Sequence, residues 1–116
     1  MSDTSEARIR ALCLALPDAT EKIAWGEPTF RVHGRIFAMF GSDKEASSIW
    51  CKSETELRDA LIGSDPDHYF SPPYVGHKGW IGIRLDEATD WECVANLIEE
   101  SFLMIAAKGA KGKGQR

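Results

Sequence analysis

The spacing of apolar residues along the chain predicts three helices. Apolar side chains recur every three or four positions from Ile9 to Leu16, which places them on one face of a helix. Ser53 and Glu56 have the spacing of a capping box that opens a second, shorter helix. A third helix carries one apolar stripe over residues 91–105. The expected helices are 3–16, capped by Asp3, 53–63, capped by Ser53, and 89–109, capped by Thr89 and ended by Gly109.

Segments with strand character, bounded by turn residues, predict five strands. Tight turns are expected at Gly26-Glu27-Pro28 and at His33-Gly34-Arg35. The segment Ser64–Gly79 contains three prolines and is expected to be a long loop, a kind of segment that often has a function. The expected strands are Glu21–Trp25, Thr29–Val32, Ile36–Phe40, Ser47–Lys52 and Trp80–Leu85.

The alternation of side chains along a strand assigns residues to the two faces of the expected sheet. In the hairpin around His33-Gly34-Arg35, Phe30, Val32, Phe37 and Met39 share one face, and Arg31, His33, Ile36 and Ala38 share the other. In the last strand Ile81, Ile83 and Leu85 point inward, and Trp80, Gly82 and Arg84 point outward. Trp25 and Trp50 are near strand ends and are expected to be core residues.

The order of the expected elements, α-β-β-β-β-α-β-α, predicts an α+β fold. It is a two-layer arrangement in which one antiparallel sheet has helices on one face and leaves its other face open. At 116 residues the chain has room for one domain, which we place at residues 1–107. Residues 108–116 are rich in Gly and Lys and are expected to form a disordered basic tail.

Charge and cysteine usage narrow the class of protein. The chain has a net charge of −4, and because residues 108–116 hold four bases, residues 1–107 carry 10 bases against 18 acids, a net charge of −8. No apolar run approaches the roughly 18–20 residues that a membrane span needs. The three cysteines have no C-x-x-C spacing and suit a reducing compartment. We therefore expect a cytoplasmic protein that does not contact membranes.

Several segments, taken in order, resemble one known family. They are Gly26-Glu27-Pro28-Thr29-Phe30, Gly34-Arg35-Ile36-Phe37-Ala38, Lys52 before Ser53, the stretch from Pro72 to Ile81, and a last helix that opens at Asp90-Trp91 and continues through Ser101-Phe102. Over about residues 5–107 this pattern resembles the MmcQ/YjbR-like family. The resemblance implies a compact fold like that of secretion chaperones. It also implies a DNA-binding role, in which paired hairpins act as wings, and it supplies no catalytic residue.

A cluster of cations and aromatic residues on the open sheet face is the leading candidate site. Guanidinium and ammonium groups neutralise phosphates, while aromatic rings offer flat apolar surface, so the combination suits anionic ligands or stacked bases. The basic hairpin turn adds Arg35 to this group. The candidate residues are Arg31, Arg35, Lys52, Tyr74, His77, Lys78, Trp80 and Arg84.

Other chemistry has little support in the sequence. No nucleophile with a partner base is recognisable, and Asp65, Asp67, His68 and His77 lack the spacing of a metal site. Cys13 and Cys51 are expected to be core residues. We expect no cofactor, no metal and no enzymatic activity. Two kinds of binding module stay open, one for DNA and one for a small ligand or a protein partner that docks on the proline-rich loop and the open sheet face.

Overall fold

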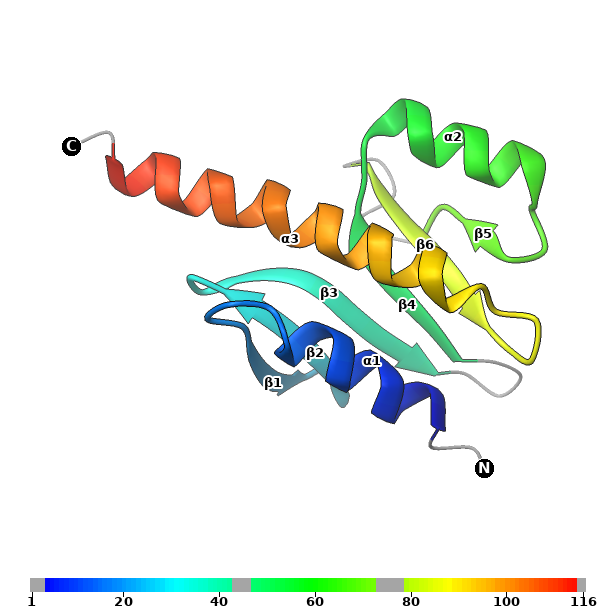
Figure 1. The fold of residues 1–116 in the computed structure, drawn as a ribbon, viewed down its shortest axis with the longest axis horizontal. Coiled ribbons are helices and arrows are strands. Elements are labelled where there is room, and N and C mark those ends of the chain that lie inside the picture. The colour runs from blue at the N-terminus through cyan, green and yellow to red at the C-terminus, as the bar shows by residue number, and fades with distance from the viewer. Residues whose placement is uncertain (1–3, 43–46, 73–78, 115–116) are drawn as a thin grey trace.

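A computed structural model describes residues 4–42, 47–72 and 79–114 of the chain (Figure 1). Within these ranges the elements are α1 (Thr4–Leu14), β1 (Thr20–Ala24), β2 (Glu27–Val32), β3 (Arg35–Ser42), β4 (Ser47–Lys52), α2 (Thr55–Ser64), β5 (Tyr69–Phe70), β6 (Trp80–Leu85) and α3 (Trp91–Gly114). The cap that the sequence predicts at Asp3 lies outside the described residues. None of the helices in the described ranges is both long and apolar enough to cross a membrane.

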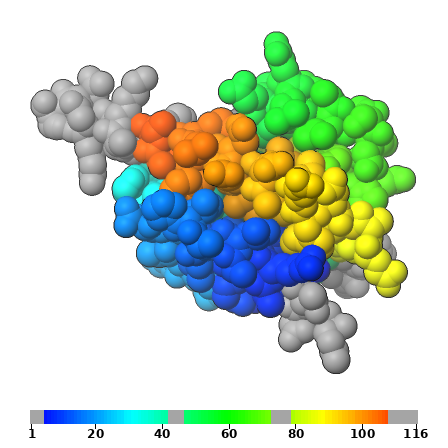
Figure 2. All heavy atoms as spheres, viewed as in Figure 1, coloured from blue at the N-terminus to red at the C-terminus, as the bar shows by residue number. Residues whose placement is uncertain are grey.

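The strands form one antiparallel sheet in the order β1-β2-β3-β4-β6-β5. Helices α1 and α3 lie together on one face of this sheet, which we call the helix face (Figure 1), and in Figure 2 their side chains cover most of it. Helix α2 lies beside β5 and β6 and contains no buried residue. We call the opposite side of the sheet the outer face. The α+β fold predicted from the sequence is confirmed.

Two hairpin turns have the same construction. Trp25 and Gly26 have φ values of 53° and 80°, and His33 and Gly34 repeat these values. Two residues with positive φ between paired strands form the type I′ turn that fits the twist of a hairpin. The predicted turn at Gly26-Glu27-Pro28 is therefore wrong by one to two residues, because Glu27 already pairs with Ala24 and belongs to β2.

A β-bulge at Phe37 changes the predicted faces of the second hairpin. Phe30 pairs with Ala38 and Arg31 pairs with Ile36, so Phe37 has no partner in β2. Ala38 is consequently buried on the helix face, and Met39 lies half-buried on the outer face. The predicted faces of Ala38 and Met39 are therefore wrong, because the prediction assumed that the β2–β3 pairing contains no inserted residue.

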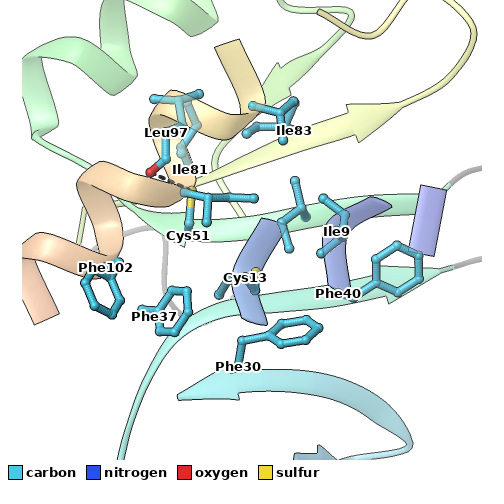
Figure 3. Packing of buried hydrophobic residues seen from close by; sticks show 14 of the residues in the cluster. Ile9, Cys13, Phe30, Phe37, Phe40, Cys51, Ile81, Ile83, Leu97 and Phe102 are labelled. Atoms are coloured by element: carbon cyan, nitrogen blue, oxygen red, sulfur yellow. Dashed lines mark hydrogen bonds between the residues drawn. The ribbon is translucent and has the colours of Figure 1, made fainter. Parts of the chain in front are cut away.

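The core lies between the helix face and the two helices (Figure 3). Phe37 packs edge-to-face against Phe102 of α3, with 5.4 Å between ring centroids. Cys13 and Cys51 are fully buried, as the sequence predicts, and the thiol of Cys51 donates to the carbonyl oxygen of Leu97. Burial raises the pKa of Cys51 to about 12 and also raises that of Cys13, so both thiols stay protonated and unreactive.

Helix ends and one strand differ from the predictions. Helix α2 begins after Glu54, which makes no side-chain cap, while the predicted cap Ser53 is buried. The cap of α3 is Asp90, whose carboxylate accepts the backbone N–H of Cys93; the hydroxyl of Thr89 instead accepts that of Asp86. Helix α3 also continues past Gly109 to Gly114. The two-residue strand β5, within the predicted loop, was not predicted.

Candidate functional site

A row of paired residues crosses the whole sheet on its outer face. Lys22 pairs with Thr29, Thr29 with Met39, Met39 with Trp50, and Gly82 pairs with both Trp50 and Phe70. Residues directly opposite one another in a sheet share a face. This row therefore shows that β1 to β6 all contribute to one continuous surface.

Three aromatic or cationic side chains lie together where β5 joins this surface. The ring of Phe70 lies over Gly82, so near that a methyl group on Gly82 would come within 2.3 Å of it. Phe70 also meets Trp50 edge-to-face at 6.5 Å, and the guanidinium of Arg84 lies 4.5 Å from the Phe70 ring centroid. Because Gly82 has no side chain, the ring of Phe70 can lie directly on the sheet at this position. The guanidinium of Arg84 lies next to the same ring.

The candidate residues from the sequence are distributed over more than one place. Arg31, Lys52 and Arg84 occupy outer-face positions, because they pair with Ile36, Trp80 and Ser48. Trp50 and Gly82 lie between Arg84 and the Lys52–Trp80 pair, so the three cations do not form one compact group. Arg35 pairs with the core residue Val32 and is therefore on the helix-face side of the hairpin end. Tyr74, His77 and Lys78 lie outside the described residues.

Three of these side chains are less available than the sequence suggests. Trp80 lies on the outer face but is only 8% exposed, so it does not offer a stacking surface to solvent. The guanidinium of Arg84 donates to the carbonyl oxygens of Pro66 and Asp67, at 3.3 and 3.1 Å. Arg31 donates from its Nε to the hydroxyl of Thr29 at 3.2 Å.

The outer face is nevertheless basic although the chain is acidic. By the register of the described strands, it carries four cations (Lys22, Arg31, Lys52 and Arg84) and one acid (Glu27). The chain as a whole has 14 basic and 18 acidic residues. The sheet thus concentrates positive charge on the face that α1 and α3 leave uncovered.

A second polar cluster lies at the turn before β5. The Nδ1 atom of His68 is 3.1 Å from a carboxylate oxygen of Asp65, and its Nε2 atom is 3.1 Å from one of Asp86. Hydrogen bonds to Asp65 and then to Asp86 raise the pKa of His68, because both carboxylates favour the charged ring. Sequence reasoning noted Asp65 and His68 but missed Asp86, which follows β6. In the described part of the chain, no group of three or more such side chains has metal-binding geometry.

Two apolar side chains at the β1 edge of the sheet are exposed. Trp25, at the tip of the first hairpin, is 80% exposed, and Ile23 in β1 is 60% exposed. The prediction that Trp25 is a core residue is wrong, because the residue lies in the turn itself. Trp50 is half-buried on the outer face.

Cys93 is the half-buried thiol of the three and lies near the start of α3. Its Sγ is 3.2 Å from the hydroxyl of Tyr69 in β5. Burial, followed by the contact with Cys93, raises the pKa of Tyr69. The pair therefore links β5 to α3.

Solved structures similar to this chain share its fold. A Deinococcus radiodurans protein with a DUF419 domain aligns with a TM-score of 0.78 and 21% identity, over 87% of this chain and 78% of its own. A Pseudomonas syringae protein aligns with a TM-score of 0.68 and 18% identity, over 88% and 97%. A Bacillus subtilis protein of the DUF1801 family aligns with a TM-score of 0.58 and 18% identity, over 87% and 77%.

The sequence comparison agrees with the resemblance inferred from the motifs. No curated protein matches the chain. Residues 14–104 match the family described as YjbR, a range that includes every strand and most of α3. The protein belongs to the YjbR family.

Proposed function

We propose that the protein is a non-enzymatic binding module whose outer face binds DNA through the phosphates. The observation that carries this proposal is the excess of four cations over one acid on that face, within a chain that is acidic overall. Phosphate contacts dominate the affinity of proteins for DNA, and Lys and Arg make most of them. The motif resemblance to a family described as DNA-binding supports the same choice.

The arrangement favours contacts to phosphate over base stacking. Trp80 is buried, and Arg84 lies over the ring of Phe70, so neither ring offers a free face to a base. Lys22 is exposed at the β1 edge, and Arg31 lies two pairs further along the same hairpin, on the same face. A bound strand would therefore follow the cations from β1 toward β4.

The test is fluorescence anisotropy of a labelled duplex and a labelled single strand at two salt concentrations. Lys22→Glu and Arg31→Glu should each weaken binding and lower the dependence of log K on log salt concentration by about 1. Arg35→Glu is the matched control, because it changes the net charge equally from the other face of the same hairpin. Replacing Lys108, Lys111 and Lys113 with Gln in the full chain measures the contribution of the basic C-terminal segment.

The outcomes separate the possible sources of binding. Equal losses for Arg31→Glu and Arg35→Glu would move the contact from the outer face to the hairpin end. A loss confined to the lysine-to-glutamine variant would make binding a property of the C-terminal charges. If neither DNA form binds at low salt, the DNA proposal is wrong.

A protein partner is the second candidate, and the exposure of Trp25 favours it. A tryptophan that is 80% exposed at a hairpin tip, with Ile23 60% exposed nearby in sequence, resembles the aromatic anchors found at protein interfaces. A photoreactive amino acid placed at Trp25 should cross-link to a specific protein in cells. The same group at exposed Glu99 should not, and absence of a specific adduct from position 25 would remove this candidate.

A further inference from the structure

The α2–β5 segment is attached to the rest of the fold by a short strand pairing and by side-chain contacts of β5, including Phe70 on Gly82 and Tyr69 on Cys93. Helix α2 contains no buried residue, and β5 pairs with β6 through only Tyr69 and Phe70. Segments with little buried surface open more readily than the core of a protein. A polar contact that joins this segment to the end of β6 therefore adds to the interactions that hold it in place.

His68 makes such a contact through both of its ring nitrogens. Nδ1 faces Asp65, at the end of α2, and Nε2 faces Asp86, in the turn that follows β6. The side chain of His68 is 25% exposed, so protons from solvent reach it. The backbone of the same residue also takes part, because its carbonyl oxygen accepts the N–H of Arg84 at 2.7 Å.

The number of carboxylates to which the His68 ring can donate a hydrogen bond depends on its protonation state. A protonated imidazole has two N–H donors, one for each carboxylate. The neutral ring keeps one N–H, and its other nitrogen presents a lone pair to carboxylate oxygens about 3 Å away, which is repulsive. One of the two bonds is then lost.

We propose that Asp65, His68 and Asp86 form a proton-operated clamp that fastens the α2–β5 segment to β6. The clamp is closed when His68 is charged and opens when the ring loses its proton to solvent. Asp65 and Asp86 are the charged groups that contact the ring, while Arg84 of β6 is directed to the carbonyl oxygens of Pro66 and Asp67. This inference does not depend on DNA binding.

The direction of the pH effect follows from the sign of the pKa shift. The pKa of His68 in the folded protein is raised above the ordinary value of 6.5 by its bonds to Asp65 and Asp86. The stabilisation is therefore complete below pH 6.5 and is lost as the pH rises through the raised pKa. The clamp therefore opens at a pH above 6.5.

Two NMR measurements on the full-length protein test the clamp. The first follows the ring carbons of His68 with pH. The second follows hydrogen exchange of the Arg84 amide, whose acceptor is the carbonyl oxygen of His68, after correction for the intrinsic pH dependence of exchange. We expect protection of this amide to fall severalfold as the His68 ring loses its proton.

Variants assign the effect to the clamp. His68→Gln should remove the pH dependence of Arg84 protection, because glutamine does not titrate. His33→Gln, at an exposed turn on another hairpin, should leave it unchanged. Asp86→Asn keeps the histidine and should move its titration to lower pH, which provides a second test if His68→Gln folds poorly.

Three results would overturn the proposal. Arg84 protection could stay constant across the His68 titration in the unmodified protein. His68→Gln could retain the full pH dependence. Asp86→Asn could leave the pKa of His68 unchanged, which would show that the Nε2 contact does not persist in solution.

Discussion

The hydroxyl of Ser101 in α3 donates a 2.6 Å hydrogen bond to the carbonyl oxygen of Phe37, the bulged residue of β3. The same hydroxyl accepts the backbone N–H of Lys52 at 2.9 Å. The regular β3–β4 pairing ends at Ala38 and Cys51, and Phe37 and Lys52 are the next residues beyond that pair on the two strands. A fully buried side chain of a helix thus satisfies two backbone groups at the point where the bulge interrupts the sheet.

Ser101→Ala should lower the free energy of unfolding by about 2–4 kcal/mol, since it leaves one buried donor and one buried acceptor without partners. Urea unfolding monitored by circular dichroism measures the change. Ser64→Ala is the control, because Ser64 bonds a carbonyl oxygen in an exposed position and its loss should cost less than about 0.5 kcal/mol. Equal losses for both variants would contradict the role given to Ser101.

Gly82→Ala should destabilise the protein by about 1–3 kcal/mol, because the added methyl group would displace the ring of Phe70. The reason is specific to that ring, so the same substitution in a Phe70→Ala background should cost less than about 0.5 kcal/mol. Unfolding of the four proteins completes a double-mutant cycle. Additive losses in the cycle would show that another contact requires the glycine.

Gly63→Ala provides a control of opposite sign for Gly82→Ala. Gly63 lies within α2, and nothing stands within 4 Å of a methyl group placed there. Alanine favours a helix over glycine by roughly 0.5–1 kcal/mol, so this variant should be more stable than the original protein. A loss of stability would mean that α2 requires a glycine for a reason other than space.

Strands that pair regularly and are bounded by clear turn residues could be predicted from the sequence. Ser47–Lys52 and Trp80–Leu85 have the predicted bounds, because each segment has strand character and is followed or preceded by turn residues. The bulge at Phe37 could not be predicted from alternation, which assumes continuous pairing. Its polar partner, Ser101, is 64 residues away in the sequence, so only the folded chain brings them together.

The candidate site was predicted in part for the same reason. The alternation of side chains predicted that Arg31 and Arg84 lie on the outer face, and the strand register places them there. It did not predict that Phe70 would lie over Gly82, because β5 has only two residues and lies in a segment rich in turn residues. The contact between His68 and Asp86 also depends on β5 pairing with β6.

Glu21→Gln tests the ion pair that joins β1 to α1. Hydrogen bonds from Arg10 hold the pKa of the Glu21 carboxyl below its usual value, at distances of 2.7 and 2.8 Å. Because the folded-state pKa is lowered, the stabilisation is present above the unfolded pKa of 4.5 and is lost as the pH falls through the folded-state value. We expect a loss of about 0.5–1 kcal/mol at pH 7, since both side chains are partly exposed.

Unfolding of both proteins between pH 7 and pH 2.5 measures this dependence. The difference between Glu21→Gln and the unmodified protein should shrink toward the acid end. Glu99→Gln, at an exposed position of α3, should show a small difference at every pH. A difference for Glu21→Gln that does not vary with pH would assign its effect to packing instead of charge.

Trp25→Asn should stabilise the protein, although it removes a large apolar side chain. Trp25 has a φ of 53°, a conformation that costs a bulky residue free energy and that asparagine adopts readily. Its ring is 80% exposed, so little packing is lost, and we expect the free energy of unfolding to rise by about 0.5–1 kcal/mol. His33→Asn, at the equivalent position of the other turn, should change it less, because histidine tolerates positive φ better than tryptophan. A rise in the free energy of unfolding that is confined to Trp25→Asn would mean that the chain keeps an exposed tryptophan at a cost in stability, as expected for a binding residue. A fall would show instead that the ring packs against the fold.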